Sequence, residues 1–309
     1  MKTLLAAALL LGAADWKERA PLPEPRAGSM AGTPGGRYVL AGGSFWKDDV
    51  KHWTARVDIF DPARNVWEPG PALPEPRSDA ACATLGDTLY IFGGGADGDV
   101  TADAYALRGG GWQALPAARL PEARLYPVAT VLDGAVYVTG GIARAGDYST
   151  VTNTLWRWTP GGAWETLPAL PGPRRTSHAA TAFGGKLFVF GGVTSRGGNL
   201  ENLADAWVYD PAARAWSALP QLPVVRRAWA AAAAGDTILL LGGYTDDFAT
   251  DVWAFDPRTG ATRRAGSLPH PLADIRVSAI GSALYLAGGE TAPKIRGHWT
   301  LEGRFNPIR

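Results

Sequence analysis

A short stretch near the C-terminal end, GETAPKIR at residues 289–296, carries an acid and a cation in what is otherwise a connector. It follows the apolar run LYLAGG and places Glu290 six residues before Arg296. A carboxylate can take up and return a proton, and a guanidinium can hold a carboxylate or phosphate through paired hydrogen bonds. These two side chains therefore predict acid–base chemistry on a small anionic ligand.

Arginine recurs at one position along the chain, where a proline-rich crossing leads into a run of small residues. If these segments converge, their guanidinium groups encircle one end of the molecule and form a positive funnel suited to an anionic ligand. A structural role is the alternative, because a buried arginine can tie neighbouring elements together through backbone carbonyls. We predict these substrate-binding residues: Arg26, Arg77, Arg124, Arg174 (beside Arg175), Arg226 (beside Arg227) and Arg276.

Polar and aromatic residues in the neighbouring connectors give weaker signals. Tyr244 and Asp247 of YTDDFAT are predicted to contact the ligand, although Asp246 and Asp247 can also be solvated turn residues. His298, two residues beyond Arg296, is either a proton donor or, more often in such a place, a strand cap. Phe45 and Trp46 can stack on a sugar or simply pack within the fold.

The composition excludes several classes of function. With 309 residues, 46% hydrophobic content and a formal charge of +1, the chain is a globular protein with no overall field for nucleic acid or an anionic membrane. Four histidines are scattered along the chain, and Cys82 is the only cysteine, so neither a clustered copper site nor an internal disulfide is expected. Cys82 itself is expected to be a buried small residue, and no metal or redox cofactor is predicted.

The N-terminal residues MKTLLAAALLLGAADW combine one lysine, an apolar run and small residues. This pattern predicts a signal peptide over residues 1–14, cleaved after Ala14 and too short to span a bilayer. The expected product is exported, to the periplasm in a Gram-negative host, and has no membrane span. The alternative is a cytosolic chain with an apolar start.

Internal repeats organise the rest of the chain. Glycine pairs close six similar apolar runs at intervals of 46–51 residues, and each unit also contains a Gly/Asp-rich two-residue turn and a proline-rich crossing. A tryptophan recurs in four units, whereas the fifth has Arg264 near that position. The runs are YVLAGG, LYIFGG, VYVTGG, LFVFGG, ILLLGG and LYLAGG.

A unit of about fifty residues with four short antiparallel strands resembles the kelch motif. The resemblance implies an all-β fold over residues 15–309: a six-bladed kelch β-propeller with four antiparallel strands per blade. The alanine-rich runs suit the innermost strands, which converge on the propeller axis. The last unit lacks its fourth strand, so the N-terminal segment DWKERAPLP is expected to supply it and close the ring.

Within this fold, GETAPKIR resembles the Gly-Glu-x-x-Pro-x-x-Arg signature of the kelch-type N-acetylneuraminate mutarotases, also called epimerases, and of their cyclically permuted relatives. The resemblance implies an isomerase that interconverts the α and β anomers of N-acetylneuraminic acid (sialic acid) without a cofactor, with Glu290 and Arg296 as its catalytic pair. A non-enzymatic kelch propeller that binds protein or glycan is the alternative, because one fold hosts many functions.

Overall fold

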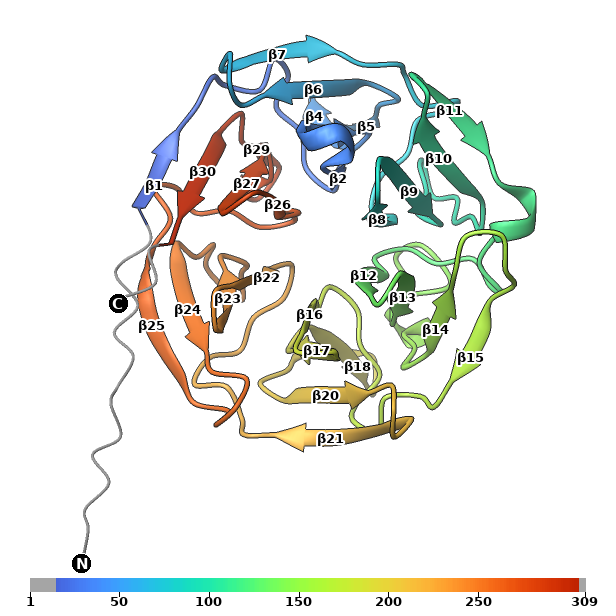
Figure 1. Cartoon of the computed structure of the whole chain (residues 1–309), viewed down its shortest axis with the longest axis vertical. Helices are drawn as coiled ribbons and strands as arrows, with labels where there is room; N and C mark the ends of the chain where they lie inside the picture. The colour runs from blue at the N-terminus through green and yellow to red at the C-terminus, as the bar shows by residue number, and fades with distance from the viewer. Residues whose placement is uncertain (1–14, 306–309) are drawn as a thin grey trace, which may run out of the picture.

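The computed structural model describes residues 15–305 as a ring of six four-stranded antiparallel sheets around a central axis (Figure 1). The predicted all-β, six-bladed propeller is therefore confirmed. The predicted signal peptide, residues 1–14, lies outside the described residues. No helix in the described part of the chain is long and apolar enough to cross a bilayer.

The first three blades follow the chain in order, and their strands are given from the axis outwards. Blade 1 contains β2 (Met30–Gly32), β3 (Tyr38–Ala41), β6 (Val57–Asp61) and β7 (Val66–Pro69). Blade 2 contains β8 (Ala81–Leu85), β9 (Thr88–Phe92), β10 (Ala104–Arg108) and β11 (Gly111–Ala114). Blade 3 contains β12 (Val128–Leu132), β13 (Ala135–Thr139), β14 (Leu155–Trp158) and β15 (Glu165–Leu167).

The last three blades complete the ring. Blade 4 contains β16 (Ala179–Phe183), β17 (Lys186–Phe190), β20 (Ala206–Asp210) and β21 (Ala215–Leu219). Blade 5 contains β22 (Ala230–Ala234), β23 (Thr237–Leu241), β24 (Asp251–Phe255) and β25 (Thr262–Ser267). Blade 6 contains β26 (Ser278–Ile280), β27 (Ala283–Ala287), β30 (Thr300–Arg304) and β1 (Asp15–Glu18).

Shorter elements lie in the connections. Three loops between a second and a third strand form small hairpins, in blades 1, 4 and 6. The hairpins are β4 (Ser44–Lys47) with β5 (Val50–Trp53), β18 (Val193–Arg196) with β19 (Asn199–Asn202), and β28 (Glu290–Ala292) with β29 (Ile295–Arg296). The 3-10 turns are η1 (Pro34–Gly36), η2 (Pro116–Ala118) and η3 (Tyr148–Thr150).

The N-terminal strand closes the ring as predicted. β1 pairs antiparallel with β30, and Trp16 lies opposite Gly303. A side chain at Gly303 would place its first carbon 2.7 Å from the Trp16 ring, so the glycine makes room for the tryptophan. This pairing covers the strand edge that blade 6 would otherwise expose.

The glycine pairs join each blade to the next. In blade 1, Gly43 donates its backbone N–H to the carbonyl oxygen of Arg77, at 2.8 Å, at the entrance to blade 2. Gly42 has a φ of 61°, and a side chain there would meet the same Arg77 oxygen at 2.2 Å. Positive φ and this close approach of two backbones together require glycine. Equivalent bonds run from Gly94 to Arg124, Gly141 to Arg175, Gly192 to Arg226, Gly243 to Leu272 and Gly289 to Arg26.

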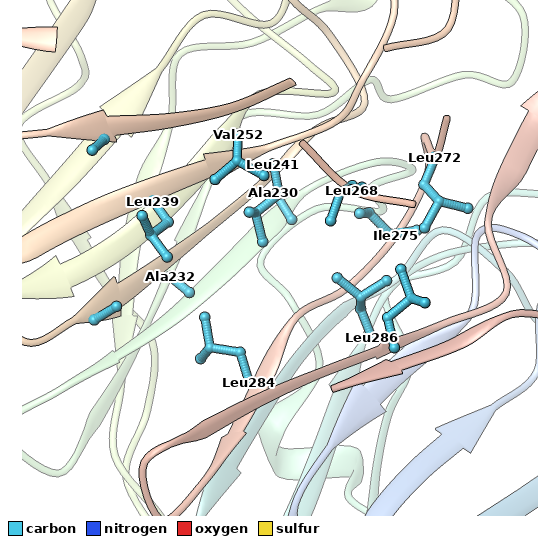
Figure 2. Close-up of a cluster of buried hydrophobic side chains, with 13 residues drawn as sticks. Ala230, Ala232, Leu239, Leu241, Val252, Leu268, Leu272, Ile275, Leu284 and Leu286 are labelled. Carbon is cyan, nitrogen blue, oxygen red and sulfur yellow. The ribbon is translucent and has the colours of Figure 1, made fainter. Parts of the chain in front are cut away.

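Hydrophobic clusters fill the spaces between neighbouring blades. Figure 2 shows the cluster between blades 5 and 6, where Leu272 lies near Leu268, Ile275 and Leu286. At the axis, side chains are small, and the predicted inner strand of five alanines, Ala230–Ala234, is β22. Small residues here let six strands approach the axis without collision.

Candidate functional site

One end of the ring carries the loops between second and third strands, and we call this end the mouth. Glu290 and Arg296 both lie here, facing each other as partners across the β28–β29 hairpin. Arg296 Nη1 lies 2.5 Å from Glu290 Oε1, and both side chains are largely buried, with 8% and 15% exposed. Nη1 forms no well-directed hydrogen bond, so the contact is an electrostatic one.

The hairpin is fixed to blade 1 and to the crossing that leads into its own blade 6. Arg296 Nε donates to the carbonyl oxygen of Ser44 in blade 1, at 3.3 Å. Glu290 exchanges two backbone hydrogen bonds with Ala273, and its side chain accepts from the backbone N–H of Lys294. The acid and the cation are therefore positioned by the backbone of two blades.

A ring of six residues in the left-handed conformation surrounds the axis at the mouth. Five of the six neighbouring pairs are joined by a backbone hydrogen bond, such as those from Asp79 N to Gly28 O at 2.7 Å and from Asp274 N to Ala228 O at 2.9 Å. Left-handed backbone is uncommon outside glycine, asparagine and aspartate, so the ring stores strain beside the site. Its members are Gly28, Asp79, Tyr126, Ser177, Ala228 and Asp274, with φ between 50° and 66°.

Two members of this ring are carboxylic acids. Burial, followed by the negative charges of Asp79 and Glu290, raises the pKa of Asp274 to about 7 against the opposing charges of Arg296 and Arg276. Burial also raises the pKa of Asp79, against Lys51 and a hydrogen bond from the Ser78 hydroxyl. The mouth thus holds one acid, Asp274, that can carry a proton near neutral pH.

Three phenols surround these acids. The charge of Asp79 and then burial hold the pKa of Tyr126 well above its usual value. Burial, followed by the charge of Asp274, raises the pKa of Tyr148 and raises that of Tyr244 to about 12. Each phenol therefore keeps its proton over the physiological range and can donate a hydrogen bond to a polar ligand.

Five arginines lie in the crossings, the segments that join the outer strand of one blade to the inner strand of the next. Their side chains pack into the body of the ring, which we call the wall, rather than into the axial opening. Arg26 is 1% exposed and donates to Asp58 at 2.7 Å, and Arg175 donates to Asp205 through two nitrogens and to the carbonyl oxygen of Gly191. Each of the five has a carboxylate as partner, and the partners of Arg77 and Arg124 are exposed at the surface. The ion pairs are Arg26–Asp58, Arg77–Glu75, Arg124–Glu122, Arg175–Asp205 and Arg226–Asp251.

Of the predicted substrate-binding arginines, Arg26, Arg77, Arg124 and Arg226 thus lie in the wall, and we leave them out of the site. Arg174 is exposed, whereas the adjacent Arg175 occupies the wall position. The structure does not bring these five side chains together as the predicted funnel around a ligand.

Blade 6 departs from the pattern. Gly243 donates to the backbone of Leu272, which therefore occupies the crossing position that arginine holds elsewhere. Arg276 follows four residues later and lines the axial cavity instead. The corresponding residues of the other blades carry no charge; they are Met30, Ala81, Val128, Ala179 and Ala230. Arg276 is thus the one predicted arginine that faces the axis.

The axial cavity, of about 370 Å³, runs between the inner strands. Thr130 and His178 line it, and each has a buried side-chain atom, Oγ1 and Nδ1, without a hydrogen-bond partner among residues 15–305. Burial lowers the pKa of His178 to about 3, so its ring is neutral. Cys82 also lines the cavity and is partly exposed to it rather than fully buried.

The remaining predicted residues are spread around the mouth. Phe248 stacks on the Tyr244 ring, and the Arg227 guanidinium lies over the same ring at 4.5 Å, so Tyr244 offers its hydroxyl more readily than a free face. Asp246 and Asp247 are exposed turn residues. Phe45 stacks on His52, Trp46 lies under Lys294, and the exposed His298 lies against Trp299.

Five further residues of the mouth were not among the site residues predicted from the sequence. They are Asp79, Asp274, Tyr126, Tyr148 and Arg227. A signal for two of them was available. Asp79 and Asp274 follow the crossing position by two residues, as do the other members of the left-handed ring. Alignment of the six units on that position would have shown two acids in one column.

The amino-acid sequence is similar to those of known kelch-repeat proteins, which supports the propeller fold. Residues 148–289 match the model described as the KLHDC2/KLHL20/DRC7 Kelch-repeats domain, and residues 123–171 match the Kelch motif. Human Kelch-like protein 34 is 32% identical over 241 residues, covering 74% of this chain and 36% of that protein. Kelch-like protein 15 of Danio rerio is 25% identical over 258 residues, covering 76% and 42%. The chain thus spans less than half the length of these relatives.

Comparison with solved structures gives the same fold. The structure of YjhT aligns with a TM-score of 0.76 and covers 91% of this chain and 95% of that one, at 17% sequence identity. At that identity the likeness establishes the fold alone. Together with the sequence matches and the six repeated blades, it makes this chain a kelch-repeat β-propeller.

Proposed function

We propose that the mouth catalyses the interconversion of the α and β anomers of N-acetylneuraminic acid. The observation that carries the proposal is the contact between Glu290 and Arg296, held at 2.5 Å across the β28–β29 hairpin at the mouth of the ring. The resemblance of GETAPKIR to the mutarotase signature suggests the reaction, and the grouping of acids, phenols and arginines around the pair supports it.

Mutarotation requires a base, an acid and a cation. The base takes the proton of the anomeric hydroxyl, the acid supplies one to the ring oxygen, and the cation holds the substrate carboxylate. Glu290 is the proposed base. Arg296, Arg276 and Arg227 are available for the carboxylate, because within residues 15–305 none of them forms an ion pair with a carboxylate other than Glu290.

A proton NMR time course tests the proposal. Freshly dissolved α-N-acetylneuraminic acid is followed with buffer, the wild-type protein, Glu290→Gln and Glu68→Gln, a matched change on outer strand β7. We expect the wild type and Glu68→Gln to accelerate anomer exchange, and Glu290→Gln to lose roughly 10²–10⁴-fold or fall to the buffer rate. A wild-type rate equal to buffer would refute the mutarotase.

A binding protein without turnover is the second candidate. Three large apolar side chains are exposed on the hairpins of the mouth: Val50 (56%), Leu200 (47%) and Ile295 (58%). Such side chains suit contact with a protein or glycan, and the curated relatives carry Kelch-like names. Calorimetric binding of N-acetylneuraminate with no acceleration of anomer exchange would favour this candidate.

A further inference from the structure

We infer that Asp274 is the proton donor to the ring oxygen, the acid that complements Glu290. The inference rests on the proposed mutarotase function and adds the second half of its proton transfer. It begins with position: Asp274 directly follows Ala273, which exchanges two backbone hydrogen bonds with Glu290, at 2.8 and 2.9 Å. The two acids therefore belong to paired segments of one rigid element.

The backbone of Asp274 is fixed on both sides. Its N–H donates to Ala228 O at 2.9 Å, and its carbonyl oxygen accepts from Gly28 N at 3.2 Å. Its φ of 51° belongs to the left-handed ring. Its carboxyl group, in contrast, forms no side-chain hydrogen bond with any residue from 15 to 305. A fixed backbone with an uncommitted carboxyl is what a proton donor to a ligand requires.

The surroundings favour the neutral acid. Burial and two neighbouring carboxylates raise the pKa of Asp274, and Asp79 is the larger contributor of the two. Glu290, by contrast, is in direct contact with a guanidinium and serves as the carboxylate. Two acids of one site are thus placed in different environments, one suited to donate a proton and the other to accept it.

The charged and titratable groups that act on this region come from five blades. Lys51 acts on Asp79, and Arg276 and Arg296 act on both aspartates. Arg227 lies against Tyr244, and the three phenols stay protonated. The full set is Lys51, Asp79, Tyr126, Tyr148, Arg227, Tyr244, Arg276, Glu290 and Arg296.

The proton transfer balances. The anomeric O–H bond breaks as its proton moves to the Glu290 carboxylate, and the anomeric carbon gains a C=O bond. The bond from that carbon to the ring oxygen breaks, and the ring oxygen takes the proton of Asp274, which becomes a carboxylate. After rotation of the open chain, both transfers reverse and the ring closes on the other face. The protein returns to its starting state with no co-reactant.

The test uses the full-length protein and N-acetylneuraminic acid, with anomer exchange measured by NMR from pH 5 to pH 9. Asn suits the left-handed backbone at this position, so Asp274→Asn should fold. We expect it to lower kcat about 100-fold with little change in KM, and to remove the decline of activity above about pH 7. Asp87→Asn, an exposed turn residue at the opposite end of blade 2, is the matched control and should behave as the wild type.

A second variant makes the test specific. Asp79→Asn removes the neighbouring negative charge, so it should move the decline in activity to lower pH without abolishing catalysis. If Asp274→Asn keeps the wild-type rate and pH profile, the inference is overturned while the mutarotase stands. If the wild type itself matches buffer, the mutarotase is refuted, and the role of Asp274 with it.

Discussion

Arg174 and Arg175 are consecutive residues with opposite environments. Arg175 is 1% exposed and donates to both carboxylate oxygens of Asp205, at 2.8 and 2.6 Å, whereas Arg174 is exposed to solvent. The repeated arginines were interpreted either as ligand-binding or as structural residues. In this blade the structural role belongs to Arg175 and not to Arg174.

This contrast gives a stability prediction. Arg175→Ala leaves the Gly191 carbonyl without its side-chain donor and leaves Asp205 with the Trp207 indole N–H but no cation, and we expect it to lower the free energy of unfolding by about 3–5 kcal/mol. Arg174→Ala should change it by less than about 0.5 kcal/mol. Chemical denaturation of the two variants measures both values. Equal losses would contradict the wall role of Arg175.

Arg276 should act on ligand binding rather than on stability. Uncharged residues occupy the same place in the other five blades, so Arg276→Leu should keep the fold. Loss of a charged hydrogen bond to the substrate carboxylate, worth about 1.5–3 kcal/mol, should raise KM by roughly 10–100-fold. Kinetics over a range of N-acetylneuraminate concentrations measures this, with Arg174→Leu as the control. An unchanged KM would remove Arg276 from the clamp.

Asp274 should make stability depend on pH. Because its pKa rises from an ordinary acidic value to about 7 on folding, its contribution is fully present in acid and is lost as the pH rises through 7. Asp274→Asn removes this loss, so the variant should exceed the wild type in Tm by a few degrees at pH 8 and by less at pH 5. Thermal unfolding at the two pH values measures the difference, and a constant difference would argue against a titrating Asp274.

Ring closure depends on a glycine. Gly303→Ala would place a carbon 2.7 Å from the Trp16 ring, and we expect the overpacking to cost about 1–3 kcal/mol. Gly111→Ala is the matched control, because this strand glycine has open space beside it. Thermal unfolding should show a lower Tm for the first variant only. A fall in both would point to strand propensity rather than to closure.

Most of the fold could be predicted from the sequence, because glycine pairs and tight turns recur in every unit. The crossings were harder. In the crossing into blade 5, the arginine at the crossing position, Arg226, follows Leu222 by four residues. The residue four positions after Leu268, in the crossing into blade 6, is Leu272, so the absence of arginine there was visible in the sequence. In blade 4 the same count from Leu170 gives Arg174, yet the extra residue of that crossing places Arg175 in the wall. Only the backbone bond from Gly141 decides between them.

The candidate site was predicted in part. Glu290 and Arg296 were identified by their motif, and the structure places them in contact. Asp79 and Asp274 were missed because their role depends on burial and on each other's charge, which come from blades 2 and 6. Neither property is local in the sequence.

The closure of blade 6 by β1 also sets the order in which the site can assemble. The outer strand of this blade is made first during synthesis, and its other strands, from Ser278 to Arg304, are made last. Glu290 and Arg296 belong to this late segment, and Asp274 lies in the crossing that leads into it. A chain shortened after blade 5 therefore lacks both the strands that pair with β1 and the proposed acid–base groups, so closure of the ring and assembly of the site should coincide.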